Sequence, residues 1–144
     1  MHATKEFSSI SELKHIREQK SRLSEREAEL SVPVLDNISL IPQVYKWFVD
    51  ISSQIKPDVS FDNVIQRKKF LYVALFLFAP SVLAGGRMPN GIRSELSNVF
   101  PDITPCVISN NIREAGFEYK QYKDFRKDID YIYIEILNRL KEIV

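Results

Sequence analysis

The residues between positions 104 and 113 have the types and spacing that could read the bases of DNA. Thr104 can accept a backbone hydrogen bond at the start of a helix, and Pro105 suits the first helical position. Ile108 and Ile112 make one side of this helix apolar. On the outward side, asparagine can pair with adenine and arginine with guanine. The exposed candidates are Cys106, Ser109, Asn110 and Arg113.

A second short helix is expected directly before this one. Residues 90–100 (NGIRSELSNVF) place Ile92 and Leu96 on one face, Asn90 can cap the helix, and a proline follows it. Two short helices joined by a tight turn, the second capped by a threonine, are typical of a helix-turn-helix, here at about residues 90–119. In that motif the second helix enters the major groove, and its N-terminus approaches a phosphate.

Residues 85–133 resemble the helix-turn-helix DNA-binding domains of bacterial regulators and of phage or mobile-element proteins. The pattern cap-x-x-x-aliphatic-Ser-x-x-aliphatic is formed by Thr104, Ile108, Ser109 and Ile112. The turn at residues 100–103 is longer than the usual glycine-centred three, and the first helix has no obvious small residue. The resemblance implies double-stranded DNA as the partner. It also implies a role in transcription regulation or in a step of a phage or mobile element.

Basic residues are concentrated around this segment. The chain has a net charge of +1, but residues 64–127 hold ten Lys and Arg against five Asp and Glu, a net +5. Residues 1–31 balance, whereas 32–63 and 128–144 are each −2. Contact with phosphates requires positive charge, so this distribution favours DNA binding. The expected phosphate-binding residues are Arg87, Arg93, Lys120 and Lys123.

Aromatic residues alternate with these cations near the end of the segment, at Phe117, Tyr119, Tyr122 and Phe125. Aromatic rings among cations can stack the bases of a single strand. Their helical spacing favours the other interpretation, in which the rings pack this helix against the last one.

The N-terminal residues 8–30 form a polar segment with helical periodicity. Ser9 and Glu12 make a capping box, which predicts where the helix begins. The a and d positions of a coiled coil are occupied by Leu13, Ile16, Leu23 and Leu30, with Lys20 and Glu27 at the remaining a positions. This seam either joins two copies of the chain as a homodimer, or belongs to an arm that lies along its own domain or extends free of it.

The composition gives little support for catalysis or for metal binding. The only histidines, His2 and His15, lie in the N-terminal arm, and the chain has a single cysteine, Cys106. A zinc site needs several converging His and Cys ligands. No phosphate-binding GxxxxGK[ST] loop and no GxGxxG fingerprint occurs. We therefore expect a non-enzyme with no catalytic residue, metal, cofactor or small-molecule substrate.

The most apolar segment, residues 70–84, predicts a buried central helix. It has 15 uncharged residues, interrupted by Pro80, whereas a membrane-spanning helix needs about 20. The first residues show no signal peptide, and a lone cysteine forms no internal disulfide. These features predict a cytoplasmic protein without a membrane segment.

The sequence as a whole predicts an all-α fold, a small helical bundle containing the helix-turn-helix and preceded by a helical arm. The expected domains are 1–35 (arm and linker) and 36–144 (helical domain). Helices are expected at 8–30, 42–55, from Ser60 or Asp62 to 79, 81–84, 90–100, 105–119 and 124–143. The alternative to DNA binding is a non-catalytic structural or adaptor protein that acts through its N-terminal helix.

Overall fold

A computed structural model of the chain describes residues 2–56 and 63–143. These residues form α-helices and one short 3-10 helix, with no strand among them, so the predicted all-α class is confirmed. The chain divides into two compact units, the first ending at Val32 and the second beginning at Pro33. Leu35 belongs to the second unit, where its N–H donates to the carbonyl of Leu77 at 2.9 Å.

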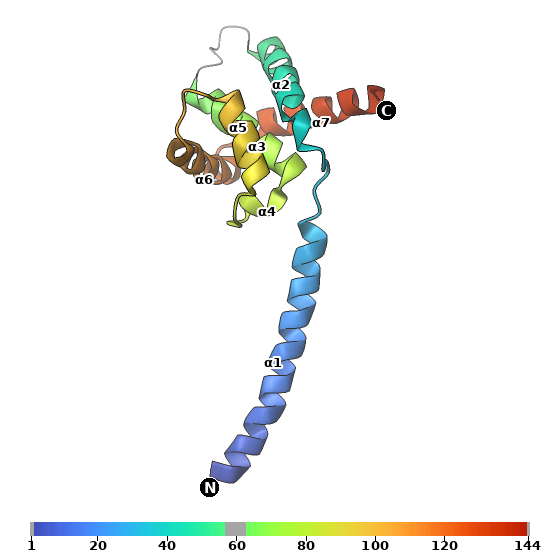
Figure 1. Cartoon of the computed structure of the whole chain (residues 1–144), viewed down its shortest axis with the longest axis vertical. Coiled ribbons are helices and arrows are strands. Elements are labelled where there is room, and N and C mark those ends of the chain that lie inside the picture. The colour runs from blue at the N-terminus through green and yellow to red at the C-terminus, as the bar shows by residue number, and fades with distance from the viewer. Residues whose placement is uncertain (1, 57–62, 144) are drawn as a thin grey trace. The chain divides into compact units, whose positions relative to one another are not determined.

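The first unit is a single helix, α1 (His2–Leu30), drawn as an unbroken blue coil in Figure 1. The capping box at Ser9 and Glu12 does not mark its start, because the helix extends seven residues further toward the N-terminus than Ser9. That expectation was wrong. Residues 7–30 are all exposed, including the apolar side chains of the a and d positions.

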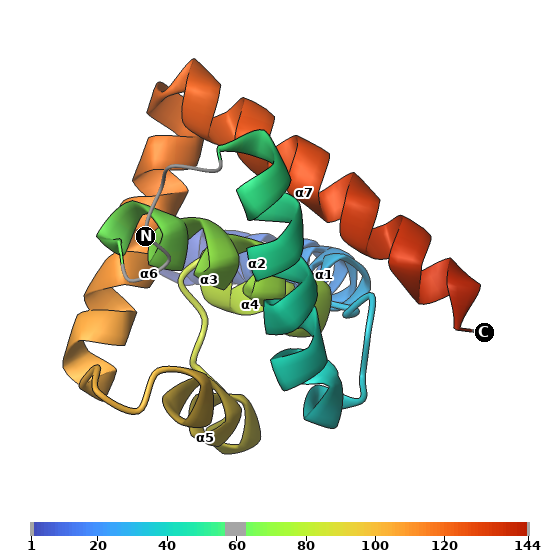
Figure 2. The same cartoon turned by 90° about the horizontal axis from the view of Figure 1, so that it is seen from above.

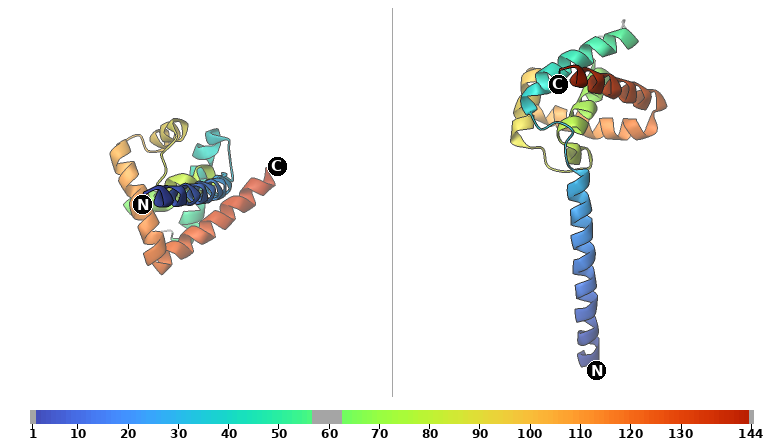
Figure 3. Two further views of the ribbon diagram at one scale, coloured as in Figure 1. Left: turned by 90° about the horizontal axis from the view of Figure 1, so that it is seen from below. Right: turned by 90° about the vertical axis from the view of Figure 1, so that its right-hand side faces the viewer.

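The second unit contains a 3-10 helix, η1 (Ile38–Leu40), and the helices α2 (Ile41–Ile55), α3 (Val64–Phe78), α4 (Pro80–Leu83), α5 (Asn90–Val99), α6 (Pro105–Gln121) and α7 (Lys123–Glu142). Helix α3 lies in the middle and contacts α2, α4, α6 and α7 (Figure 2). Helices α6 and α7 meet at a sharp corner (Figure 3), where only Tyr122 separates them.

Helix α3 is central because most of its surface is apolar. Ten of its fifteen residues are buried, as expected for a helix that is hydrophobic nearly all round. The carboxamide of Asn63 accepts the Ile65 N–H at 2.7 Å and caps the helix; the expected caps Ser60 and Asp62 lie outside the described residues. The helix ends at Phe78, before Pro80, which begins α4. The prediction of a buried central helix is confirmed.

Aromatic rings hold α2, α3 and the end of α5 together. The ring of Phe70 on α3 lies 4.9 Å from Tyr45, 5.5 Å from Phe48 and 5.7 Å from Phe100, in edge-to-face contacts. This arrangement of rings is favoured over a face-to-face sandwich. The apolar stripe of α2 predicted from the sequence therefore packs on α3, with Phe48 fully buried.

Of the two helix caps predicted around the loop regions of α5 and α6, one is confirmed and one is wrong. Thr104 caps α6 as expected, with its hydroxyl oxygen accepting the Val107 N–H at 3.3 Å. Asn90 does not cap α5, because it is already the first helical residue and Pro89 occupies the cap position. After α4, Gly85 turns the chain with a φ of +97°, a backbone conformation that favours glycine.

Helix α3 also carries cations into the interior. Lys69 is 4% exposed, and its Nζ lies 2.8 Å from Oδ2 of Asp128 on α7. Lys56, at the end of α2, lies 3.0 Å from the same oxygen. Burial on its own raises the pKa of Asp128, but the two lysines outweigh it and hold this pKa below its ordinary value.

Replacing Asp128 with Asn should destabilise the fold in a pH-dependent way. The folded state holds Asp128 at a lower pKa than the unfolded chain does. The carboxylate therefore stabilises the fold above about pH 4 and loses this effect as the pH falls through the depressed pKa. We expect Asp128→Asn to lower the free energy of unfolding by about 2 kcal/mol or more at pH 7.

The difference in stability between the parent and Asp128→Asn should shrink as the pH falls below about 4, through the depressed pKa of Asp128. Urea unfolding at a series of pH values measures this, with Glu142→Gln on the exposed end of α7 as the control. A difference that stays constant down to pH 2 would contradict the assignment.

Candidate nucleic-acid interface

Helix α6 has a buried side and an exposed side. Its buried residues are Ile108, Asn111, Ile112 and Ala115, and this side faces α3 and α7. The spacing of three and four places all of them on one face of the helix. The opposite face is therefore left to solvent.

The residues predicted to read bases lie on that exposed side, with one exception. Cys106, Ser109 and Arg113 are exposed, whereas Asn110 is half-buried. The guanidinium of Arg113 donates to the side-chain oxygen of Asn110, so these two side chains already bind each other. Their base-reading roles would require this hydrogen bond to be exchanged for bonds to a base.

The N-terminus of α6 offers fewer free N–H groups than the motif suggests. Thr104 accepts the N–H of Val107, and Pro105 has no N–H to donate. The Ile108 N–H donates to the carbonyl of Thr104 at 3.1 Å. Of the first helical turn, the Cys106 N–H is therefore the group best placed to donate to a phosphate.

Two shallow cavities bring predicted phosphate-binding residues next to α6. In one, of about 20 Å³, Arg93 of α5 lies beside Pro105 and Ser109. The other, of about 360 Å³, is lined by Arg113 and Lys120 of α6 and by Gly85. Each cavity is therefore lined both by an exposed cation and by residues of α6.

The remaining phosphate-binding candidates, Arg87 and Lys123, lie outside these two cavities. Arg87 is exposed and follows Gly85 by two residues, which places its backbone near the second cavity. Lys123 is also exposed, but it begins α7 beyond the end of α6. Nothing groups it with the other candidates.

Helices α5 and α6 pack mainly on other elements rather than on each other. Helix α5 contacts α2 and η1, and α6 contacts α3 and α7. The two helices meet where Leu96 and Ile108 line the smaller cavity, and residues 100–104 connect them.

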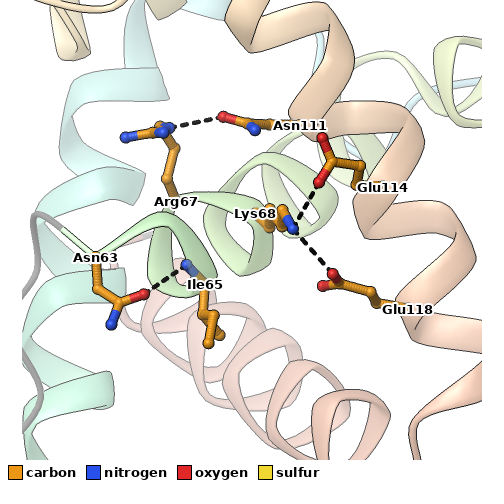
Figure 4. Close-up of polar contacts among 7 residues, drawn as sticks. All are labelled: Asn63, Ile65, Arg67, Lys68, Asn111, Glu114 and Glu118. Carbon is orange, nitrogen blue, oxygen red and sulfur yellow. Dashed lines mark hydrogen bonds and ion pairs between the residues drawn. The ribbon is translucent and has the colours of Figure 1, made fainter.

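The sequence count overestimated the positive charge that the surface carries. Arg67, Lys68 and Lys69 are part of the net +5, but Arg67 and Lys68 bind side chains of α6 (Figure 4), and Lys69 binds Asp128 of α7. Glu114 and Glu118, which pair with Lys68, leave the count with it, so seven Lys and Arg remain against three Asp and Glu, a net charge of +4. The surface of this region therefore has fewer cations for phosphates than the sequence count suggests.

The sequence interpretation missed the residues of α6 that receive these cations. Arg67 Nε donates to Asn111 Oδ1 at 2.7 Å. Lys68 Nζ lies 2.8 Å from Glu114 and 2.9 Å from Glu118, between the two carboxylates (Figure 4). A helical spacing of three and four from Asn111 through Glu114 to Glu118, opposite three consecutive cations, was the available signal.

Lys68 stays charged in this position. Burial on its own lowers its pKa, but the hydrogen bonds to Glu114 and Glu118 outweigh it and leave the pKa above its ordinary value. The contact therefore holds α6 on α3 through one shared cation.

The aromatic residues at the end of α6 are only partly in the core. Phe125 is 7% exposed, and Tyr119 stacks on Tyr72 of α3 with ring centroids 4.6 Å apart. Phe117 and Tyr122 are 59% and 55% exposed and contact each other edge to face. Packing thus explains the first pair, and the second pair lies on the surface.

A metal-binding cluster, a membrane-spanning helix and a known relative are three other features that could indicate a function. No cluster of three or more His, Cys, Asp or Glu that could hold a metal occurs in residues 2–56 and 63–143. No helix within those ranges is long and apolar enough to cross a membrane. Comparisons with protein-family models, curated proteins and solved structures found no match to the chain.

The sharing of Lys68 between Glu114 and Glu118 predicts how much each carboxylate contributes to the free energy of unfolding. Glu114 is 52% exposed at its side chain, so Glu114→Gln should cost about 1 kcal/mol or less of the free energy of unfolding. Removing both carboxylates leaves Lys68, whose side chain is 9% exposed, as an uncompensated cation. The double variant with Glu118→Gln should therefore lose about 3 kcal/mol or more.

A double-mutant cycle by urea unfolding at pH 7 measures this coupling. The loss in the double variant should exceed the sum of the single losses, because either carboxylate alone still pairs with Lys68. Strict additivity would show that the two carboxylates act independently of this cation.

Proposed function

We propose that the protein binds double-stranded DNA through the exposed side of α6, in a transcription-regulating or phage or mobile-element role. The observation that carries the proposal is the division of α6 into two sides. One side is locked onto α3 and α7 by apolar residues and by Lys68. The other presents small polar and basic side chains to solvent, together with Val107, Glu114 and Phe117.

In this proposal α5 and α6 act as the helix-turn-helix. Ser109 and Arg113 contact base edges, with Asn110 joining them when Arg113 releases its side-chain oxygen. Arg93 and Lys120 contact phosphates on either side of α6, because the two cavities place them next to its exposed face. Cys106 lies at the N-terminal end of this face.

The small number of surface cations predicts that one copy of the domain binds weakly. Nonspecific affinity for DNA depends on the number of phosphates that the protein neutralises. The seven Lys and Arg that remain on the surface of residues 64–127 offer few such contacts. A second copy, joined by α1, would double them and let two recognition helices contact successive turns of the major groove.

The exposed seam of α1 suits such pairing. Leu13, Leu23 and Leu30 of this helix are 52–68% exposed. A parallel pair would place Lys20 against Lys20 and Glu27 against Glu27. In an antiparallel pair, an a position faces a d position, so Lys20 meets Leu23 and Glu27 meets Ile16. We therefore propose the antiparallel homodimer.

DNA binding is tested by fluorescence anisotropy with mixed-sequence duplexes at several salt concentrations. The parent should bind, with an affinity that falls steeply as salt rises. Arg113→Ala should weaken binding about fivefold or more, since a good contact to a base is worth ~1–3 kcal/mol. Lys120→Ala should reduce the salt slope by about 1.

Lys46→Ala is the matched control, because Lys46 is an exposed cation on α2, away from α6. It should bind like the parent. The proposal fails if the parent does not bind at low salt, or if Lys46→Ala loses as much affinity as Arg113→Ala.

Pairing through α1 is tested by analytical ultracentrifugation of the full chain. Leu23→Glu should raise the dimer dissociation constant about tenfold or more, whereas Ser21→Glu, off the seam, should leave it unchanged. Replacing both Lys20 and Glu27 with Leu should strengthen the dimer.

Two results would contradict the antiparallel homodimer. Rapid disulfide formation by Lys20→Cys, with Cys106→Ser to remove the native thiol, would show a parallel pair. A parent that stays monomeric at high concentration would exclude the homodimer. The exposed seam would then favour the second candidate function, an adaptor that binds a different protein through α1.

A further inference from the structure

A cavity of about 190 Å³ lies between α3, α6 and α7, and aromatic rings form most of its wall. Tyr72 and Phe76 come from α3, Tyr119 from α6 and Tyr133 from α7. Tyr72 and Tyr119 are stacked, with an interplanar angle of 12°, whereas Phe76 and Tyr133 are edge to face at 5.1 Å. The cavity is therefore held open by two pairs of rings from three helices.

One carboxylate, Asp130 on α7, also lines this cavity. Its Oδ1 accepts the hydroxyl of Tyr119 at 2.7 Å. The other carboxylates between these helices, Glu118 and Asp128, are each paired with a lysine of α3. Among the residues that the structure describes, no cation lies within ion-pair distance of Asp130.

The tyrosines add no charge of their own. Burial, assisted by the hydrogen bond to Asp130, raises the pKa of Tyr119 to about 12. Burial also raises the pKa of Tyr72 and that of Tyr133. The three phenols stay neutral at physiological pH, so Asp130 supplies the one charge of the cavity lining, next to rings whose faces are electron-rich. Asp130 is itself exposed, and the positive charge of Arg126, one helical turn before it, acts on Tyr119 from outside the lining.

We infer that this cavity binds a small organic cation with an alkylated ammonium group, which contacts the rings and neutralises Asp130. Aromatic rings attract such cations through their quadrupoles, and the apolar wall suits methyl groups better than a hydrated metal ion or a bare ammonium. Sites for entire ligands span roughly 300–1,000 Å³, so the smaller volume fits a head group rather than a large molecule. The inference is independent of the proposed DNA binding.

The experiment is an NMR titration of the ¹⁵N-labelled full chain with choline chloride, at an ionic strength held constant with NaCl. Backbone amides around Tyr72, Tyr119 and Asp130 should shift in a saturable way. Asp130→Asn keeps an oxygen for the Tyr119 hydroxyl but removes the charge, and it should weaken binding about threefold to tenfold. Phe76→Leu, at a ring that is 42% exposed, should also weaken binding.

The neutral control ligand is the carbon analogue of choline, in which a tert-butyl group replaces the trimethylammonium group. It should bind much more weakly than choline. Equal binding of the two ligands would show an apolar cavity without selectivity for cations and would overturn the inference. Absence of saturable shifts with choline, while far-UV circular dichroism shows a folded chain, would overturn it as well.

Discussion

The arrangement of the helical domain depends on the cations that α3 carries into its own interior. A helix that is apolar nearly all round has to be covered, and its neighbours then enclose Lys68 and Lys69 along with the apolar side chains. A buried cation is costly unless an anion meets it. The anions come from α6 and α7, through Glu114, Glu118 and Asp128. The same contacts that neutralise α3 therefore fix how its two long neighbours are rotated.

The rotation of α6 decides which of its residues a partner can reach. With Asn111 bonded to Arg67 and both glutamates on Lys68, the opposite face of α6 turns outward. Ser109 and Arg113 are exposed for this reason. A helix turns by about 100° per residue, so a shift of one position would bury Arg113 and expose Asn111. The polar contacts to α3 thus support the proposed DNA-binding surface without being part of it.

The features that could be predicted from the sequence are those that local rules decide. Thr104 before Pro105, and Pro80 within an apolar run, specify a start and a stop through hydrogen bonding and ring geometry alone. The charge of the surface could not be predicted in this way, because a count of Lys and Arg does not show which of them face carboxylates on a distant helix. The capping box at Ser9 failed because helix-forming residues precede it and the helix continues through them. The cavity at Asp130 was missed because its aromatic wall combines residues from three helices.

Because fewer cations lie on the surface than the sequence count suggests, the proposed function depends more on pairing through α1. With Arg67, Lys68 and Lys69 withdrawn into the bundle, one copy has fewer cations for phosphates, and the proposed DNA binding relies more on a second copy. The seam of α1 is well placed in sequence for that task but contains Lys20 and Glu27, which disfavour the parallel pairing common in leucine zippers. The few surface cations of the second unit and the seam of α1 are therefore parts of one proposal, in which two paired copies bind DNA more tightly than one.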